Sequence, residues 1–227
     1  MMRRTERRPL PSHRLGPVEV LLFGIVISLG GIVLLSLAVN LLTGFLAALT
    51  ITTYLFLYTP LKRITPLATL IGGIPGALPP MMGWVAARNE VGLPAVILFA
   101  ILFLWQIPHF HSLAWIYKKD YARAGFKMLT VLDDDGSRTS RQILTCCGAL
   151  LPVSLGLTFA GITGSVYLAG AVFLGVAFLV YGILFAKFSG EDGGLALAQS
   201  NLYSRRMFSA SLLYLPGLMI LMAIDKV

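Results

Sequence analysis

Residues 93–128 read LPAVILFAILFLWQIPHFHSLAWIYKKDYARAGFKM, an apolar helix of membrane-spanning length that runs into a charged segment. The apolar part carries His109 at bilayer depth, and Asp120 follows it about three helical turns later, beside two lysines. An ionisable side chain within a membrane span is costly and usually faces a cavity or a partner. The stretch therefore predicts a helical membrane protein whose spans surround a site near these two residues.

The composition of the whole chain agrees with a membrane location. Of the 227 residues, 57% are hydrophobic and 12% are charged, whereas a soluble domain carries about 25% charged residues. Apolar runs near the ~20 residues that a helix needs to cross a bilayer recur along the sequence. A transmembrane barrel would instead show short alternating segments. We therefore expect an all-α, polytopic helical bundle.

Seven membrane-spanning helices are expected. Two lie in the continuous apolar run 18–57, with a break near residues 40–43. The other five are expected near residues 66–87, 93–117, 142–160, 166–186 and 207–223. In the third span, Gly72 and Gly76 form a small-xxx-small pair that allows close helix contact, and several prolines predict a kink or a break.

Basic residues concentrate on one side of these spans. When the N-terminus is placed in the cytoplasm, only Arg88 and Lys226 of the 18 lysines and arginines fall outside cytoplasmic segments. Short cytoplasmic loops are enriched in lysine and arginine, so the N-terminus is expected inside and the C-terminus outside. This asymmetry accounts for the formal charge of +8, and no nucleic acid partner is expected.

Three basic clusters would meet at the cytoplasmic face: RRTERRPL (3–10), YTPLKR (58–63) and YKKDYARAG (117–125). Membrane topology and contacts with lipid headgroups alone explain most of the lysines. The alternative is a diphosphate site, because arginine forks and lysine charges match phosphate oxygens and Mg²⁺ bridges these oxygens to a carboxylate. Composition alone leaves both interpretations open.

His109 has three interpretations. It lies between two tryptophans, and Pro108 before it frees a backbone carbonyl that a structural histidine would bond. It could instead ligate haem iron or move protons in a cavity. His111 points to a different face of a regular helix and is secondary. Asp133–Asp135 resemble a metal cluster, but three acids before a glycine typically form a solvated turn.

Five motifs, in this order and at membrane spacing, resemble those of the UbiA-type intramembrane prenyltransferases, in particular the members that modify haem. They are RRTERRPLP, YTPLKRITP, IGGIPGALPPMMGW, WQIPHF and KKDYARAG, and they cover nearly the whole chain. The resemblance implies a bundle of nine spans around a central cavity that opens to the cytoplasmic side. It also implies a reaction in which the farnesyl group of farnesyl diphosphate joins a vinyl group of haem b, diphosphate leaves and water is added, giving haem O on the route to haem A.

The same resemblance implies the roles of particular residues. The catalytic group would be Tyr58, Lys62 and Asp120, with Asp120 contacting Mg²⁺ directly or through water. The diphosphate would be held by Arg4, Arg8, Lys62, Arg63 and Lys119. His109 and Trp105 would contact haem, while Trp105, Phe110 and Tyr121 could shield the carbocation, although packing is their simpler role. The implied partners are farnesyl diphosphate, haem b and the lipid bilayer of the cell inner membrane, with a haem A synthase as the candidate protein partner.

Relatives carry an NxxxDxxxD-type motif at the end of their second span, immediately before the segment equivalent to RRTERRPLP. The chain starts at that segment. Residues 1–227 are therefore expected to be a single domain with seven of the nine spans and without the first aspartate motif. Two rival functions stay open: prenylation of an aromatic acid or quinone precursor by another UbiA-type member, and a non-catalytic haem-binding membrane protein.

Overall fold

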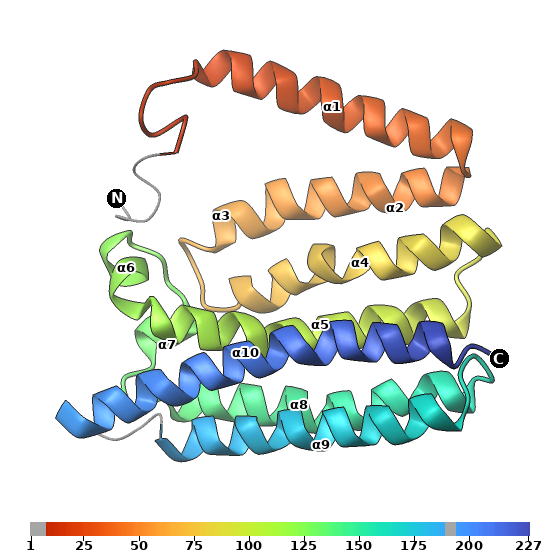
Figure 1. Ribbon diagram of the computed structural model, residues 1–227. Helices are drawn as coiled ribbons and strands as arrows, with labels where there is room; N and C mark the ends of the chain where they lie inside the picture. The colour runs from red at the N-terminus through yellow and green to blue at the C-terminus, as the bar shows by residue number, and fades with distance from the viewer. Residues whose placement is uncertain (1–7, 189–193) are drawn as a thin grey trace.

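The computed structural model describes residues 8–188 and 194–227, and helices make up most of them (Figure 1). The long helices are α1 (Pro17–Ala38), α2 (Leu41–Thr52), α4 (Ala68–Arg88), α5 (Leu93–Ile116), α8 (Ser137–Phe159), α9 (Ser165–Phe188) and α10 (Gly194–Ile224). A π-helix, η2 (Thr53–Tyr58), and α3 (Thr59–Leu61) continue α2, and the short α6 (Lys118–Arg123) and α7 (Leu129–Leu132) follow α5.

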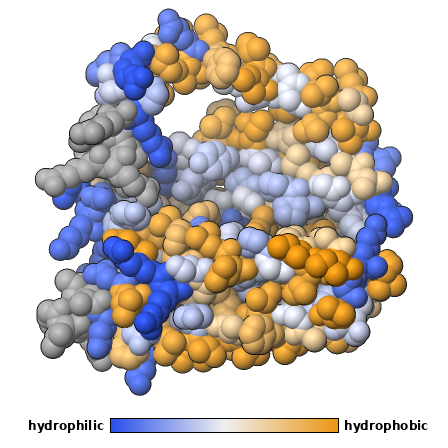
Figure 2. Space-filling view, viewed as in Figure 1, coloured by the Kyte–Doolittle hydropathy of each residue, from blue (hydrophilic) through white to orange (hydrophobic). Residues whose placement is uncertain are grey.

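Seven helices in the described part of the chain are long and apolar enough to cross a membrane, as predicted. The protein is therefore a multi-pass membrane protein. The strongly hydrophilic side chains gather at the two ends of the helices (Figure 2). One end carries α3, α6 and the start of α1, and the other carries the C-terminus (Figure 1). The last span, Gln199–Ile224, is longer than expected and lies within a helix that begins at Gly194.

The predicted break near residues 40–43 is confirmed and has a local cause. Asn40 ends the first span, and its Oδ1 accepts a 2.8 Å hydrogen bond from the N–H of Thr43, as in a helix N-cap. Its Nδ2 also donates a 3.0 Å hydrogen bond to the carbonyl of Val85. Asn40 therefore starts α2 and ties it to α4.

Of the kink or break predicted within the third span, the break is absent. Helix α4 is continuous from Ala68 to Arg88, although Pro75, Pro79 and Pro80 lie inside it. Prolines are tolerated in membrane helices where neighbouring groups satisfy the backbone, because a break would expose polar groups to lipid. The helix ends at Asn89, whose φ of 56° is the left-handed conformation common at helix C-termini.

Helix α5 lies at the centre of the bundle and packs against α4, α8 and α10. One apolar cluster joins α5, α8, α9 and α10 and includes the fully buried Ile101, Ile143 and Phe178. A second cluster, formed by Leu46, Leu78 and Val85, joins α2 to α4 and is completed by Phe99 of α5, among others. Helix α1 packs against α2, and none of its residues is buried.

Candidate active site

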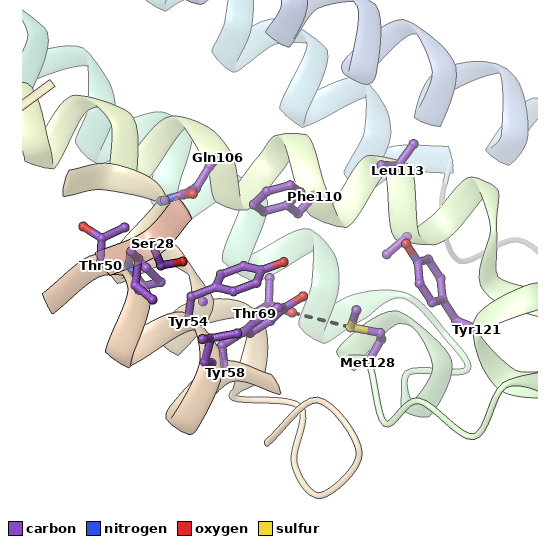
Figure 3. A pocket seen from close by; sticks show the side chains of 16 residues that line it. Ser28, Thr50, Tyr54, Tyr58, Thr69, Gln106, Phe110, Leu113, Tyr121 and Met128 are labelled. Atoms are coloured by element: carbon purple, nitrogen blue, oxygen red, sulfur yellow. Dashed lines mark hydrogen bonds between the residues drawn. The ribbon is translucent and has the colours of Figure 1, made fainter. Parts of the chain in front are cut away.

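A cavity of about 640 Å³ lies between α2–η2, α4 and α5, with further contacts from α1 and α6 (Figure 3). Most of its lining is apolar. Its polar lining side chains are Ser28, Thr50, Tyr54, Tyr58, Thr69, Gln106 and Tyr121. Such a chamber accepts an apolar chain along its walls and a polar group at a few defined positions.

Two tyrosines on the π-helix line one wall. The ring centroids of Tyr54 and Tyr58 lie 5.2 Å apart, and π-helical segments are frequent at functional sites. Gly72 on α4 makes room for the Tyr58 ring, since a Cβ at this position would lie 2.5 Å from its Cδ2. Gly76, one turn further, likewise faces the Gln106 side chain of α5. The predicted close approach at this glycine pair is therefore present.

The loop after α3 and the segment after α5 meet at one end of the bundle. The Lys62 ammonium lies 5.9 Å from the centroid of the Tyr58 ring and 5.5 Å from that of Phe126. The N–H of Lys127 donates a 3.2 Å hydrogen bond to the carbonyl oxygen of Lys62. Tyr121 packs edge-on against Phe126 and lines the cavity. Since Tyr58 also lines the cavity, segments 58–63 and 117–127 meet at one end of it, which we call its mouth.

The other predicted diphosphate ligands have few contacts. Asp120 lies in the first turn of α6, and its Oδ1 is 3.5 Å from an Arg123 nitrogen, a weak ion pair near the surface. Arg63 and Lys119 are exposed. Arg8 is exposed in the arm before α1, and α1 starts at the same end of the bundle (Figure 1). Arg4 lies outside the described residues.

A magnesium ion would have one protein carboxylate at this mouth. Within residues 8–188 and 194–227, no group of three or more His, Cys, Asp or Glu side chains could hold a metal ion. Mg²⁺ usually binds through one or two carboxylates together with substrate phosphates. Asp120 therefore fits an ion that is held jointly with a diphosphate.

The expectation of a solvated turn is wrong for Asp133. This residue is 3% exposed, and its Oδ2 accepts a 2.7 Å hydrogen bond from the N–H of Thr139 in the first turn of α8. Lys118 donates a 2.9 Å hydrogen bond to the carbonyl of Asp133 and lies over the ring of Trp115. Asp133 therefore anchors the segment that carries Asp120. Asp135 is solvent-exposed, and hydrogen bonds from the backbone and hydroxyl of Ser137 lower its pKa.

His109 faces α10 rather than the cavity. Its Nδ1 lies 2.8 Å from the Ser211 hydroxyl oxygen, and that hydroxyl donates its proton to the carbonyl of Phe208. The proton of the imidazole is therefore on Nδ1, which leaves the lone pair on Nε2. The ring lies against Trp105 and Phe208, at centroid distances of 4.8 and 4.9 Å. Trp105 donates a hydrogen bond to the Ser211 carbonyl, so both predicted haem contacts face α10.

His111 lies on another face of α5, as predicted. It is 1% exposed, and its Nε2 is 2.7 Å from Oε1 of Gln142 on α8. The amide oxygen can only accept, so Nε2–H of His111 is the donor. This hydrogen bond joins α5 to α8.

The cavity is also lined by three polar residues to which no sequence motif assigned a role: Tyr54, Thr69 and Gln106. The position of Tyr54 beside Tyr58 could have been predicted from the sequence. The two tyrosines are four residues apart, and a helix brings such side chains together. Gln106 lies within the motif WQIPHF, but the histidine there was the more conspicuous polar residue. Helical spacing places Gln106 and Phe110 on one face of α5, and both line the cavity.

The site is an apolar chamber between membrane-spanning helices, with cationic and hydroxyl groups at one mouth. It suits a ligand that has an apolar chain and an anionic head. The family model of the UbiA prenyltransferase family matches residues 1–212. The chain belongs to the UbiA prenyltransferase family and is an enzyme.

Several curated relatives carry the name protoheme IX farnesyltransferase. The protein of Solibacter usitatus is 47% identical over 225 residues, which cover 99% of this chain and 74% of that protein. The protein of Koribacter versatilis is 41% identical, with 99% and 72% covered. The protein of Salinibacter ruber is 43% identical, with 99% and 76% covered. No solved structure matches the chain significantly.

Proposed function

We propose that this protein transfers the farnesyl group of farnesyl diphosphate to a vinyl group of haem b and that water adds to the product, giving haem O. The observation that carries the proposal is the similarity to relatives named protoheme IX farnesyltransferase, at 40% to 47% identity over nearly the whole chain. The geometry of the cavity supports it, because an apolar chamber ends at a mouth with cationic and hydroxyl side chains.

The mouth would hold the diphosphate. When the allylic C–O bond breaks, the diphosphate keeps the electron pair, so fixed positive charge at that position stabilises the transition state. Lys62 is the best placed cation, since it lies beside the rings of Tyr58 and Phe126. In our proposal the Tyr58 hydroxyl donates to a phosphate oxygen. The more exposed cations Arg4, Arg8, Arg63 and Lys119 add to the field that attracts the substrate.

Asp120 would hold Mg²⁺ together with the diphosphate oxygens. When bound, the ion supplies Lewis-acid stabilisation of the negative charge on the departing diphosphate. The ion pair with Arg123 is partly exposed and costs little to break, so the carboxylate is available for this role.

Haem would approach α5 from the side of α10. Nε2 of His109 carries the lone pair that could ligate iron, and Trp105 stacks on the same imidazole. Phe110 connects this side to the prenyl chamber, because its ring contacts that of His109 and also lines the cavity. The aromatic walls exclude water, which would delay capture of the allylic cation until the vinyl carbon attacks.

The protein would work in the cell inner membrane, with residues 58–63 and 117–127 in the cytoplasm. The distribution of lysine and arginine supports this orientation, in which the C-terminus lies on the outer face. Haem O would then be available within the bilayer to a haem A synthase, the protein partner that the product implies.

Isotope-labelled farnesyl diphosphate tests the proposed reaction. Membranes that contain the protein are incubated with the labelled compound, Mg²⁺ and haem b, and in parallel with an aromatic carboxylic acid in place of haem. The proposal predicts label in the extracted haem and none in the aromatic acid. Label in the aromatic acid alone would support the rival UbiA-type activity, and label in neither would contradict prenyl transfer.

A further inference from the structure

The length of the cavity is defined by the residues that line it on two helices. On α4 they extend from Thr69 to Gly76, and on α5 from Ala114 to Gln106. At about 1.5 Å per residue, these spacings correspond to roughly 10 to 12 Å along the helix axes. Tyr58 and Tyr121 lie at the mouth, and Gln106 lies at the far end with Thr50 (Figure 3).

Gln106 is held rigidly at that far end. The side chain is 3% exposed, and its Nε2 donates a 2.6 Å hydrogen bond to the carbonyl of Gly73. This bond fixes the orientation of the amide and turns Oε1 toward Gly76, where a Cβ would collide with it. No group in the described part of the chain donates a hydrogen bond to Oε1. The chamber therefore ends at an acceptor that has no donor.

Beyond Gln106 the space between α2, α4 and α5 is filled. The second apolar cluster, Leu46, Leu78 and Val85, packs there with Met82 and Phe99. The Thr50 hydroxyl, beside this cluster, donates to the carbonyl of Leu46. A chain that enters from the mouth thus meets Gln106 and then a packed core.

Chain geometry converts this length into a number of isoprene units. Three backbone bonds of an extended polypeptide advance about 3.5 Å, so the four main-chain bonds of an isoprene unit advance roughly 4 to 5 Å. Three units then need roughly 12 to 15 Å, and a fourth brings the total to roughly 16 to 20 Å. A slightly bent farnesyl chain matches the length of the cavity, whereas an extended geranylgeranyl chain exceeds it.

We infer that Gln106, held by Gly73 and facing Gly76, is the specificity-determining residue that limits the prenyl chain to three isoprene units. The inference rests on the proposed function, which places the diphosphate at Tyr58 and Lys62. A fourth unit would have to displace the buried amide or press its methyl groups against Oε1, which would shut this acceptor off from water. Both arrangements are unfavourable.

Binding of unreactive analogues tests this inference without requiring turnover. The full 227-residue protein in detergent is titrated with the S-thiolodiphosphates of geranyl, farnesyl and geranylgeranyl chains, in which sulfur replaces the bridging oxygen. The wild-type protein should bind the farnesyl analogue more tightly than the geranylgeranyl analogue, by about ten- to two-hundredfold for a misfit of this kind. Gln106→Ala, which opens the far end, should bring the two dissociation constants close together.

A second variant shifts the preference in the opposite direction. Gly76→Ala places a methyl group where the Gln106 amide now lies, so the amide must move into the chamber and shorten it. The farnesyl analogue should then bind more weakly, while binding of the geranyl analogue is retained. Gly83→Ala is the matched control, because a Cβ at Gly83 on the same helix meets nothing within 4 Å.

The outcomes separate the inference from the proposed function. Equal affinity of the wild-type protein for all three chains, or an unchanged preference in both variants, would overturn the role of Gln106 and leave prenyl transfer intact. If no prenyl analogue bound better than inorganic diphosphate, the prenyl-binding cavity itself, and with it the proposed function, would be wrong.

Discussion

The N–H of Lys127 donates a 3.2 Å hydrogen bond to the carbonyl oxygen of Lys62, joining two loops that lie far apart in the sequence. The bond holds the Lys62 ammonium near the Tyr58 and Phe126 rings, at the cavity mouth. Lys62→Met should weaken binding of a farnesyl diphosphate analogue by about ten- to a hundredfold, since a hydrogen bond to a charged group contributes about 1.5–3 kcal/mol. Isothermal titration measures the change.

Lys226→Met is the control for Lys62→Met, because it removes the same charge near the C-terminus, at the opposite end of the bundle (Figure 1). The affinity of Lys226→Met for the farnesyl diphosphate analogue should equal that of the wild-type protein. An equal loss in both variants would show that Lys62 acts only through net charge.

Asp120→Asn should abolish prenyl transfer while leaving haem binding measurable. The amide keeps the size of the side chain but removes the negative charge that would hold Mg²⁺. Loss of the exposed contact with Arg123 should change stability by at most about 1 kcal/mol. Turnover and haem absorbance are measured on the same preparation, with Asp134→Asn, an exposed acid nearby, as control. Normal turnover of Asp120→Asn would remove Asp120 from the site.

His109→Ala should weaken haem binding and shift the Soret band of the bound haem. In the proposed arrangement the lone pair on Nε2 of His109 ligates the haem iron. This lone pair is free because the imidazole proton is on Nδ1, which donates to Ser211. His13→Asn is the control, because His13 is exposed and its φ of 55° is one that asparagine tolerates. An identical spectrum in His109→Ala would leave this residue with a packing role only.

Asp225→Ala should lower the free energy of unfolding by about 0.5–2 kcal/mol, the usual cost of losing a helix cap. The Oδ2 of Asp225 accepts a 2.7 Å hydrogen bond from the N–H of Tyr167, in the first turn of α9. Thermal unfolding in detergent reports the change. Asp134→Ala, which removes an exposed acid without a cap, should unfold like the wild-type protein.

The spans could be predicted because their signals are local. Hydropathy locates each span, and Asn40 starts α2 through its own side chain. The meeting of segments 58–63 and 117–127 was expected because both are rich in basic residues, which the positive-inside rule assigns to one side of the membrane.

The orientation of individual side chains could not be predicted in this way. Helix α5 is apolar on all sides, so its sequence does not reveal that Gln106 faces the cavity while His109 faces α10. The burial of Asp133 depends on Lys118 and on the first turn of α8, and neither contact is visible in a run of three acids. Tertiary packing determines the orientation of the Gln106, His109 and Asp133 side chains.

The mass of the haem made by this protein is the most direct test of farnesyl transfer to haem b. The protein is produced in cells that have haem b but do not farnesylate it, and the extracted haem is analysed by mass spectrometry. Cells that make the wild-type protein should contain a new species with the mass of haem b plus one farnesyl group and one hydroxyl. Cells that make Asp120→Asn should lack it. Unmodified haem b alone, from cells in which the protein is folded in the membrane, would contradict the account.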